Sequence, residues 1–438
     1  MNAHRRRLVA LARPVYLSLL SSVAAGIINT VWVSRLGSPA VAAVAVATNT
    51  ENVLLGVAMV FASGTTVLVA HARGARDPAA ARAAVRGGWA LCALVTPVVV
   101  VGGLLLREPL AHLVLGRHDG PALPLAVAYL AISLPGMAVF FVQQLVDGLL
   151  KGAGDTRTPM RLALLANGLI LLCDPFLIAL HGVPGAAAST VLCRSVALAA
   201  GLVALRRNTL LRTAARQPAA RSVAATWRTG LPMAADFTVR QGGALVLVAI
   251  VARIGVPAVA AYAIACKVMY GATMAFYAVR QAAALHTAHT RGAGTDARRA
   301  IARQAVLVSG TVGLVATGLL AAAAPWIMAA FGAGPAVAHE GVLLLRCIGP
   351  YLLLMACFIA LGGVFEGSGG APLLLRVTLA GTALQLPLAA ALSALGLPGI
   401  CLALALAMAA QGGTAAALLP REAARRQEET GVCPVRSG

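Results

Sequence analysis

The sequence predicts an all-α membrane protein, with twelve transmembrane helices in two six-helix lobes that are related by a parallel internal repeat. The first observation behind this prediction is composition. The 438 residues are 60% hydrophobic and 11% charged, whereas soluble domains usually carry about 25% charged residues. The second observation is a repeat, because RLGSPAVAAVAVA at Arg35–Ala47 returns as RIGVPAVAAYAIA at Arg253–Ala265.

The repeat extends over most of the chain. Its offset is 218 residues in the first part of each half and shortens slightly further on. Such agreement over two halves indicates a duplicated unit. The matching positions are Pro14 and Pro232, Ala70–Ala75 and Ala288–Ala293, Gly152 and Gly367, and Gly154 and Gly369.

Apolar runs of about 20 residues, long enough to cross about 30 Å of hydrocarbon, occur six times in each half. An even number of spans per half makes both halves enter the bilayer in the same sense, so their symmetry axis lies along the membrane normal. The first six runs lie near 14–36, 42–70, 86–106, 122–149, 159–181 and 184–205. The second six lie near 230–252, 257–287, 302–325, 340–365, 373–395 and 397–419.

The formal net charge of +21 could indicate a nucleic-acid partner, but the positions of the basic residues report membrane topology instead. With the N-terminus inside, 26 of the 35 Lys and Arg residues fall in cytoplasmic segments and four in outer segments. We therefore predict a multi-pass protein of the inner (plasma) membrane, with both termini cytoplasmic and no nucleic-acid partner. The four outer residues are Arg35, Arg107, Arg117 and Arg253.

The predicted organisation places a polar, Arg-rich linker between the two lobes. Cysteines are scattered singly and histidines lack zinc-ligand spacing, so we expect no metal, no cofactor and no enzymatic activity. We expect a monomer. The segments are a cytoplasmic N-terminus at 1–13, an N-lobe at 14–205, a cytoplasmic linker at 206–228, a C-lobe at 229–419 and a cytoplasmic tail at 420–438.

Several strings, read in order, identify a family. They are GIINTVWVSRLGSPAVAAVA (Gly26–Ala45), VAHARGA (Val69–Ala75), GLLKGAGDTRTPM (Gly148–Met160), DPFLI (Asp174–Ile178) and GVPGAAAST (Gly182–Thr190). Together they resemble the multidrug and toxic compound extrusion (MATE) family.

This resemblance implies a secondary transporter that exports lipophilic, often cationic, small molecules by alternating access, in exchange for protons or sodium ions. The same superfamily contains flippases for lipid-linked precursors, which is the alternative function. A flippase would be expected to have additional helices or a strongly cationic cavity. This chain has twelve predicted spans, and within them the acidic residues are concentrated in the first half and the basic residues in the second.

Ionisable groups within membrane spans are costly, so each is a candidate functional residue. Asp174 matches the aspartate that takes up a proton or cation in part of the family. The position that is commonly aspartate in the first span is Asn29 here, and Ile170 replaces an asparagine before Asp174. We therefore expect protons rather than sodium. The cation-coupling candidates are Asp174, Glu51, Asn29, Asn167 and Asp147.

Two of these candidates could instead have a purely structural role. Asp174 could be a carboxylate satisfied by a neighbouring helix, and Asp147 could form a surface ion pair with Lys151, four residues later.

The second half has a basic and aromatic character, and Asp236 is expected to pair with Arg240. If Lys267 or Arg280 stays charged and unpaired, the cavity would accept an anionic or zwitterionic substrate. Packing and snorkelling are the alternatives. The substrate-cavity candidates are Asp236, Arg240, Lys267, Tyr270, Met274, Tyr277, Arg280 and Gln143.

Overall fold

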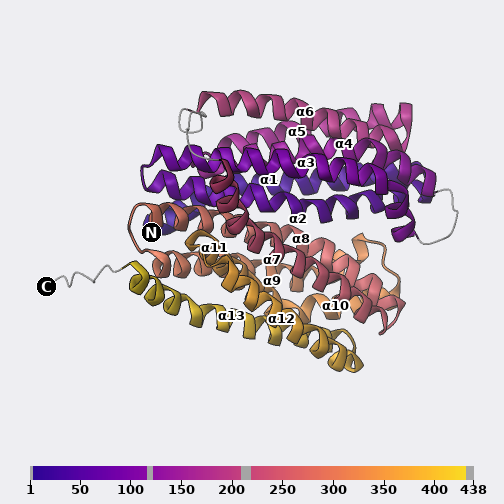
Figure 1. Cartoon of the computed structure of the whole chain (residues 1–438). Helices are drawn as coiled ribbons and strands as arrows, with labels where there is room; N and C mark the ends of the chain where they lie inside the picture. The colour runs from indigo at the N-terminus through magenta and orange to yellow at the C-terminus, as the bar shows by residue number, and fades with distance from the viewer. Residues whose placement is uncertain (1–2, 116–121, 209–218, 431–438) are drawn as a thin grey trace. The chain divides into compact units, whose positions relative to one another are not determined.

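The first half of the chain forms six long helices (Figure 1). The computed structural model describes residues 3–115, 122–208 and 219–430, and in these ranges the chain is almost entirely helical. Leu, Ala and Val dominate the helices and supply apolar faces on all sides, as expected for segments surrounded by lipid and other helices. The helices are α1 (Ala3–Ser34), α2 (Ser38–Gly74), α3 (Pro78–Leu115), α4 (Ala122–Gly152), α5 (Arg157–His181) and α6 (Val183–Arg207).

The second half repeats this pattern with one additional break. Its helices are α7 (Ala219–Ala252), α8 (Val256–Gly292), α9 (Arg298–Ala330), α10 (Pro335–Cys347), α11 (Gly349–Ser368), α12 (Ala371–Leu392) and α13 (Gly396–Thr430). A short 3₁₀ turn, Ser393–Leu395, separates the last two.

Eleven segments of the described residues are long and apolar enough to cross a membrane. One of them, Ala371–Leu419, has 49 residues and contains both α12 and most of α13. A 49-residue helical segment is more than twice the length that crosses a bilayer, so α12 and α13 count as separate spans. The predicted all-helical membrane fold with twelve spans is therefore confirmed.

One predicted span is two helices. The run at 340–365 is divided at Ile348 between α10 and α11. Pro350 lies at the first turn of α11 and has no backbone N–H to donate to the preceding turn. The Thr317 hydroxyl of α9 donates to the carbonyl of Gly349 at 3.4 Å, which connects α9 to the first turn of α11.

The segment that we expected to be a linker is partly helical. α7 begins at Ala219, so only 209–218 of the predicted linker lie outside the described residues. The sequence AARSVAATWR at 219–228 contains no Gly or Pro and many alanines, and alanine has the highest helix propensity. In the same way, α13 continues to Thr430 through much of the predicted tail.

The chain divides into two compact units. The N unit comprises Arg13–Ala234 with Gly292–Gly294, and the C unit comprises Met1–Ala12, Ala235–Arg291 and Thr295–Gly438. The division cuts α1 and α7 within their lengths. Both cuts lie close to Pro14 and Pro232, which are equivalent in the repeat, so the division approximately follows the duplicated sequence.

The first part of α7 belongs to the N unit because its backbone packs directly on two other helices. A Cβ atom at Gly230 would lie 1.7 Å from the carbonyl oxygen of Val60 in α2. A Cβ atom at Gly87 in α3 would lie 2.4 Å from the carbonyl oxygen of Ser222. Only glycine allows backbones to approach so closely, as small residues do at other membrane helix interfaces.

A related contact between helices occurs once in each unit. In the N unit, Gly148 and Gly152 of α4 face the backbone of α2, where a Cβ atom would lie 2.9 Å from the carbonyl oxygen of Ala62 and 2.8 Å from that of Thr66, respectively. In the C unit, their repeat equivalents Gly363 and Gly367 face α8. The corresponding distances are 2.1 Å to the carbonyl oxygen of Arg280 and 2.3 Å to that of Ala284.

Candidate functional site

The N unit contains a buried carboxyl group at the position where the sequence predicts coupling. Asp174 on α5 is fully buried. The side-chain amide nitrogen of Asn29 on α1 donates a hydrogen bond to its Oδ2 atom at 2.8 Å. The other oxygen, Oδ1, is buried and has no hydrogen-bond partner within the described residues. The structure thus brings two predicted residues together and leaves one carboxylate oxygen available.

Local sequence explains why this carboxyl group is enclosed. Pro175 lies inside α5 and removes one backbone hydrogen bond next to Asp174. α5 then ends at Gly182, which has a φ of 63°, a left-handed conformation that favours glycine. At Gly185 in α6, a Cβ atom would lie 2.0 Å from the carbonyl oxygen of Leu177. The chain therefore folds back closely and α6 covers α5.

Two further residues share the surroundings of Asp174, and the sequence did not indicate either. Tyr129 on α4 is buried, and the charges of Glu51, Arg194 and Asp174 all act on its hydroxyl. The Arg194 guanidinium lies over the ring of Phe140, 4.9 Å from its centroid. A single Tyr in an apolar span carries no motif that would mark Tyr129.

The other N-unit candidates lie elsewhere. The Asn167 amide donates to the hydroxyls of Ser21 at 2.8 Å and Ser22 at 3.2 Å. It is seven residues before Asp174, which is about 10 Å along a helix. Asp147 and Gln143 on α4 are half-buried, and the Oδ1 atom of Asp147 and the Oε1 atom of Gln143 have no hydrogen-bond partner within the described residues.

The C unit contains a buried ionic network centred on Arg280. This arginine is 4% exposed. Its Nη2 atom lies 2.7 Å from Oδ2 of Asp236 and 2.7 Å from Oε1 of Glu366, and its Nε atom also donates to Glu366 at 3.2 Å. The hypothesis that Arg280 stays unpaired is therefore wrong, because two carboxylates from α7 and α11 neutralise it.

Asp236 connects this network to two more residues. Its Oδ2 atom also pairs with Nη2 of Arg240 at 2.9 Å, the pair that the four-residue spacing on α7 predicts. Its Oδ1 atom accepts a hydrogen bond from the hydroxyl of Thr378 on α12 at 2.6 Å. The network thus joins four helices and contains two cations and two anions.

The sequence did not predict the role of Glu366. We placed the end of the apolar run at residue 365, one position before it, so Glu366 was not counted among the ionisable groups within spans. In the structure it is buried near the end of α11. A count that extended by one helical turn would have included it.

The substrate-cavity candidates on α8 differ in how far they are buried. Met274 is buried and Tyr277 half-buried, whereas Lys267 and Tyr270 are exposed. Arg240 lies over the ring of Tyr277, 5.7 Å from its centroid. Of these α8 residues, Tyr277 therefore contributes an aromatic ring to the ionic network. Lys267 is not part of the network.

The VAHARGA and GLLKGAGDTRTPM motifs contact each other in the N unit, and the segments equivalent to them in the repeat contact each other in the C unit. The Arg291 guanidinium, from AHTRGA, donates to the carbonyl of Ser368 at 2.7 Å. In the N unit, Arg73 from AHARGA lies against the turn at Gly154, where a Cβ atom would meet its guanidinium. Gly154 and Gly369 both have positive φ, 87° and 81°. The motifs therefore fix equivalent turns rather than forming a reactive site.

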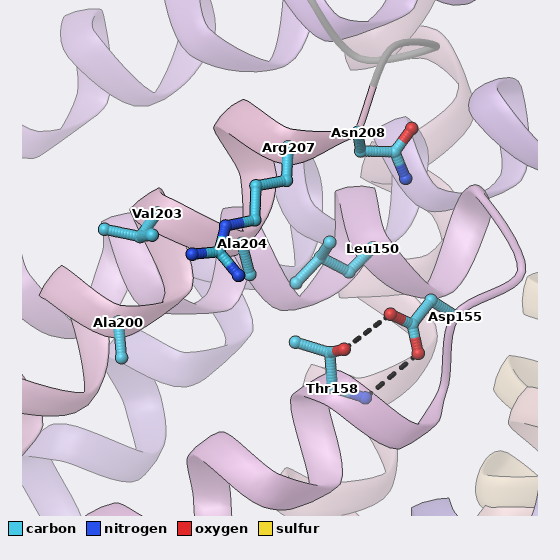
Figure 2. Close-up of a pocket in the computed structure, with 8 residues that line it drawn as sticks. All are labelled: Leu150, Asp155, Thr158, Ala200, Val203, Ala204, Arg207 and Asn208. Atoms are coloured by element: carbon cyan, nitrogen blue, oxygen red, sulfur yellow. Dashed lines mark hydrogen bonds between the residues drawn. The ribbon is translucent and has the colours of Figure 1, made fainter.

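A cavity of about 540 Å³ lies at the ends of α4, α5 and α6 (Figure 2). Asp155 organises one side, because its carboxylate accepts hydrogen bonds from the hydroxyl of Thr158 at 2.5 Å and from the Thr158 backbone N–H at 3.0 Å. Arg207 supplies a cation. None of the predicted site residues line this cavity, and within the described ranges there is no group of three or more His, Cys, Asp or Glu residues that could hold a metal ion.

Comparison with known proteins agrees with the family resemblance. The MatE family model matches residues 14–176 and 232–391. The probable multidrug resistance protein NorM of Thermotoga maritima is 26% identical over 377 residues, which cover 83% of this chain and 80% of that protein. The probable multidrug resistance protein YpnP of Bacillus subtilis is 24% identical over 254 residues, and the match spans 57% of each chain.

A solved structure shares the fold. The outward-facing conformation of a multidrug resistance MATE family transporter superposes with a TM-score of 0.90 at 20% identity, and the match covers 98% of this chain and 97% of that one. This likeness extends over both halves of the duplicated architecture. Together with the family model, which matches most of the sequence, it shows that the chain belongs to the multidrug and toxic compound extrusion (MATE) family of membrane transporters.

Proposed function

We propose that this protein is a proton-coupled antiporter that exports lipophilic drugs or secondary metabolites across the plasma membrane by alternating access. The observation that carries the proposal is the state of Asp174. It is fully buried, one of its oxygens accepts a hydrogen bond from Asn29, and the other has no partner within the described residues. The names of the curated relatives support export of small molecules.

The chemistry of such a carboxyl group suits a reversible proton site. An ionised carboxylate in an apolar interior is costly, and a proton that binds the unpartnered Oδ1 atom removes the charge. Asn29 cannot supply a compensating charge because it is neutral. Protonation therefore changes the balance between conformations, which is what an antiporter requires.

Protons are favoured over sodium by the ligands present. Metal cations such as Ca²⁺ and Mg²⁺ are held by several oxygens, and a sodium site makes a similar demand. Here Asn29 presents its amide N–H to Asp174, and Ile170, one turn earlier, offers no ligand. Among the described residues, no second carboxylate forms a hydrogen bond or ion pair with Asp174 or Asn29 at this position.

The test is transport by wild type and Asp174→Asn in bacteria that lack their own export pumps. We expect wild-type cells to export fluorescent dyes until a protonophore is added, and the variant to lose export. Asp77→Asn is the matched control, because Asp77 is exposed and accepts backbone hydrogen bonds at the start of α3. Protonophore-insensitive export that follows an imposed sodium gradient would contradict proton coupling.

A second assay, movement of a lipid-linked precursor across vesicles, distinguishes drug export from flippase activity. If wild type exports none of the dyes but moves a lipid-linked precursor across vesicles, the flippase alternative is favoured. We further infer that both termini are cytoplasmic, from the distribution of basic residues. Reporter fusions at the two ends test this topology independently of transport.

A further inference from the structure

We propose that Arg240 of the C unit binds the carboxylate of a planar aromatic acid, so that the exported compounds include aromatic carboxylates. This inference rests on the proposed export function for its physiological role. Its binding step involves different residues, on α7 and α8, and is tested separately.

The hydrogen bonding of Arg240 leaves donors available. Its Nη2 atom pairs with Asp236 at 2.9 Å, while Nε and Nη1 are buried and have no partner within the described residues. A guanidinium carries five N–H donors. Leaving buried donors without acceptors costs free energy, so an acceptor-rich group that reaches them is bound favourably.

Asp236 does not satisfy these donors in the structure, because its oxygens contact other groups. Its Oδ2 atom is shared between Arg240 and Arg280, and its Oδ1 atom accepts from Thr378. Arg280 differs from Arg240, because Glu366 gives it a second carboxylate through two hydrogen bonds. Arg240 therefore contacts fewer acceptor groups of the protein than Arg280 does.

Arg240 is also the accessible end of the network. Its side chain is 18% exposed, compared with 5% for Arg280 and 1% for Asp236. A ligand that enters at this exposed end and displaces the groups that cover Nε and Nη1 therefore reaches Arg240 before Arg280 or Asp236. Carboxylates bind guanidinium groups with short, charge-assisted hydrogen bonds.

The surroundings of Arg240 add an aromatic component. The ring of Tyr277 lies beneath the guanidinium, 5.7 Å away, and the Arg240 charge also acts on the hydroxyl of Tyr351 at the start of α11. Aromatic rings stack favourably on other aromatic rings and on guanidinium planes. A planar ring that carries a carboxylate matches both features, whereas a compound with only one of them gains less.

The experiment measures equilibrium binding to purified, detergent-solubilised protein, with salicylate as the aromatic carboxylate and salicylamide as its uncharged counterpart. We expect saturable salicylate binding by wild type, at least tenfold weaker salicylamide binding, and at least tenfold weaker salicylate binding by Arg240→Lys. Lysine keeps a positive charge for Asp236 but lacks the planar fork. Arg194→Lys is the matched control, because Arg194 also lies over an aromatic ring, and we expect it to bind salicylate like wild type.

Further variants keep the proposal testable if Arg240→Lys does not fold. Tyr277→Leu removes the ring but none of the network's ionic groups, and we expect several-fold weaker salicylate binding. Binding in detergent needs no ion gradient, so wild type that binds salicylate but does not export it distinguishes failure of coupling from failure of this site. The proposal is overturned if wild type does not bind salicylate, if salicylamide binds equally well, or if the loss with Arg194→Lys equals the loss with Arg240→Lys.

Discussion

Replacement of Gly363 by alanine tests whether direct backbone contact between α8 and α11 holds the C unit together. A Cβ atom at this position would lie 2.1 Å from the carbonyl oxygen of Arg280 and 2.9 Å from its carbonyl carbon. Both atoms belong to the α8 backbone, so they cannot rotate away as a flexible side chain could. The two helices must move apart by roughly 1 Å or more to restore an ordinary contact of about 3.5 Å.

The expected cost follows from two opposing effects. Forcing an extra methyl group into a packed interface typically costs about 1–3 kcal/mol, and a clash with backbone belongs in the upper part of that range. Alanine in place of glycine within a helix contributes up to about 1 kcal/mol in the opposite direction. We therefore expect a net destabilisation of about 1–2 kcal/mol, which corresponds to a fall in Tm of roughly 2–8 °C for a unit of this size.

The assay is thermal unfolding of the purified protein in one detergent, with Gly242→Ala as the control. Gly242 lies in α7, and a Cβ atom there would meet no heavy atom within 4 Å. The control should melt at or slightly above the wild-type temperature. If Gly363→Ala melts as high as Gly242→Ala, the helices tolerate the methyl group and the reasoning from close contact is refuted.

Three further predictions concern the ends of helices. Arg291→Ala removes the hydrogen bond to the carbonyl of Ser368, and we expect faster amide hydrogen exchange in the turn after α11, with a cost of about 1–2 kcal/mol. Asp155→Ala removes the acceptor for two backbone N–H groups and should cost about 1 kcal/mol, seen as faster exchange in the first turn of α5. Hydrogen bonds from the Arg298 side chain hold the pKa of Asp296 below its usual value, so its stabilisation is present above pH of about 4 and lost as the pH falls further. The Tm difference between wild type and Asp296→Asn should therefore be present at pH 6 and absent at strongly acidic pH.

Much of the fold could be predicted because its signals are local or periodic. Spans follow from apolar length, and the duplication follows from matching strings at a nearly constant offset. The division at Ile348 was not predicted, because the residues around it are mostly apolar and Pro350 alone does not decide between a kink and a new helix. The helical start of α7 was missed because its arginines are typical of a linker, whereas its alanines favour helix.

The candidate site was harder to predict, because its contacts join residues far apart in the sequence. The family pattern pointed to Asp174 and Asn29, and these two are in contact. The partners of Arg280 lie 44 and 86 residues away, on helices whose rotation the sequence does not specify. Spacing within one helix could reveal only the pair of Asp236 with Arg240.

The repeat explains how one helix contact came to hold an acid in the N unit and a base in the C unit. Ala62 on α2 is equivalent to Arg280 on α8, and Asp147 on α4 is equivalent to Gly362 on α11. A Cβ atom at Gly362 would lie 3.2 Å from the Arg280 guanidinium, so these two positions face each other and leave room for only one large side chain. In the N unit the side chain is an acid from one helix, and in the C unit it is a base from the other. Because the backbones touch in both units, a large residue on one helix requires a small one opposite. The duplicated halves could therefore diverge to a carboxylate, which we propose for cation coupling, and a guanidinium network, which we propose for binding an acidic ligand, while they kept the same helix packing.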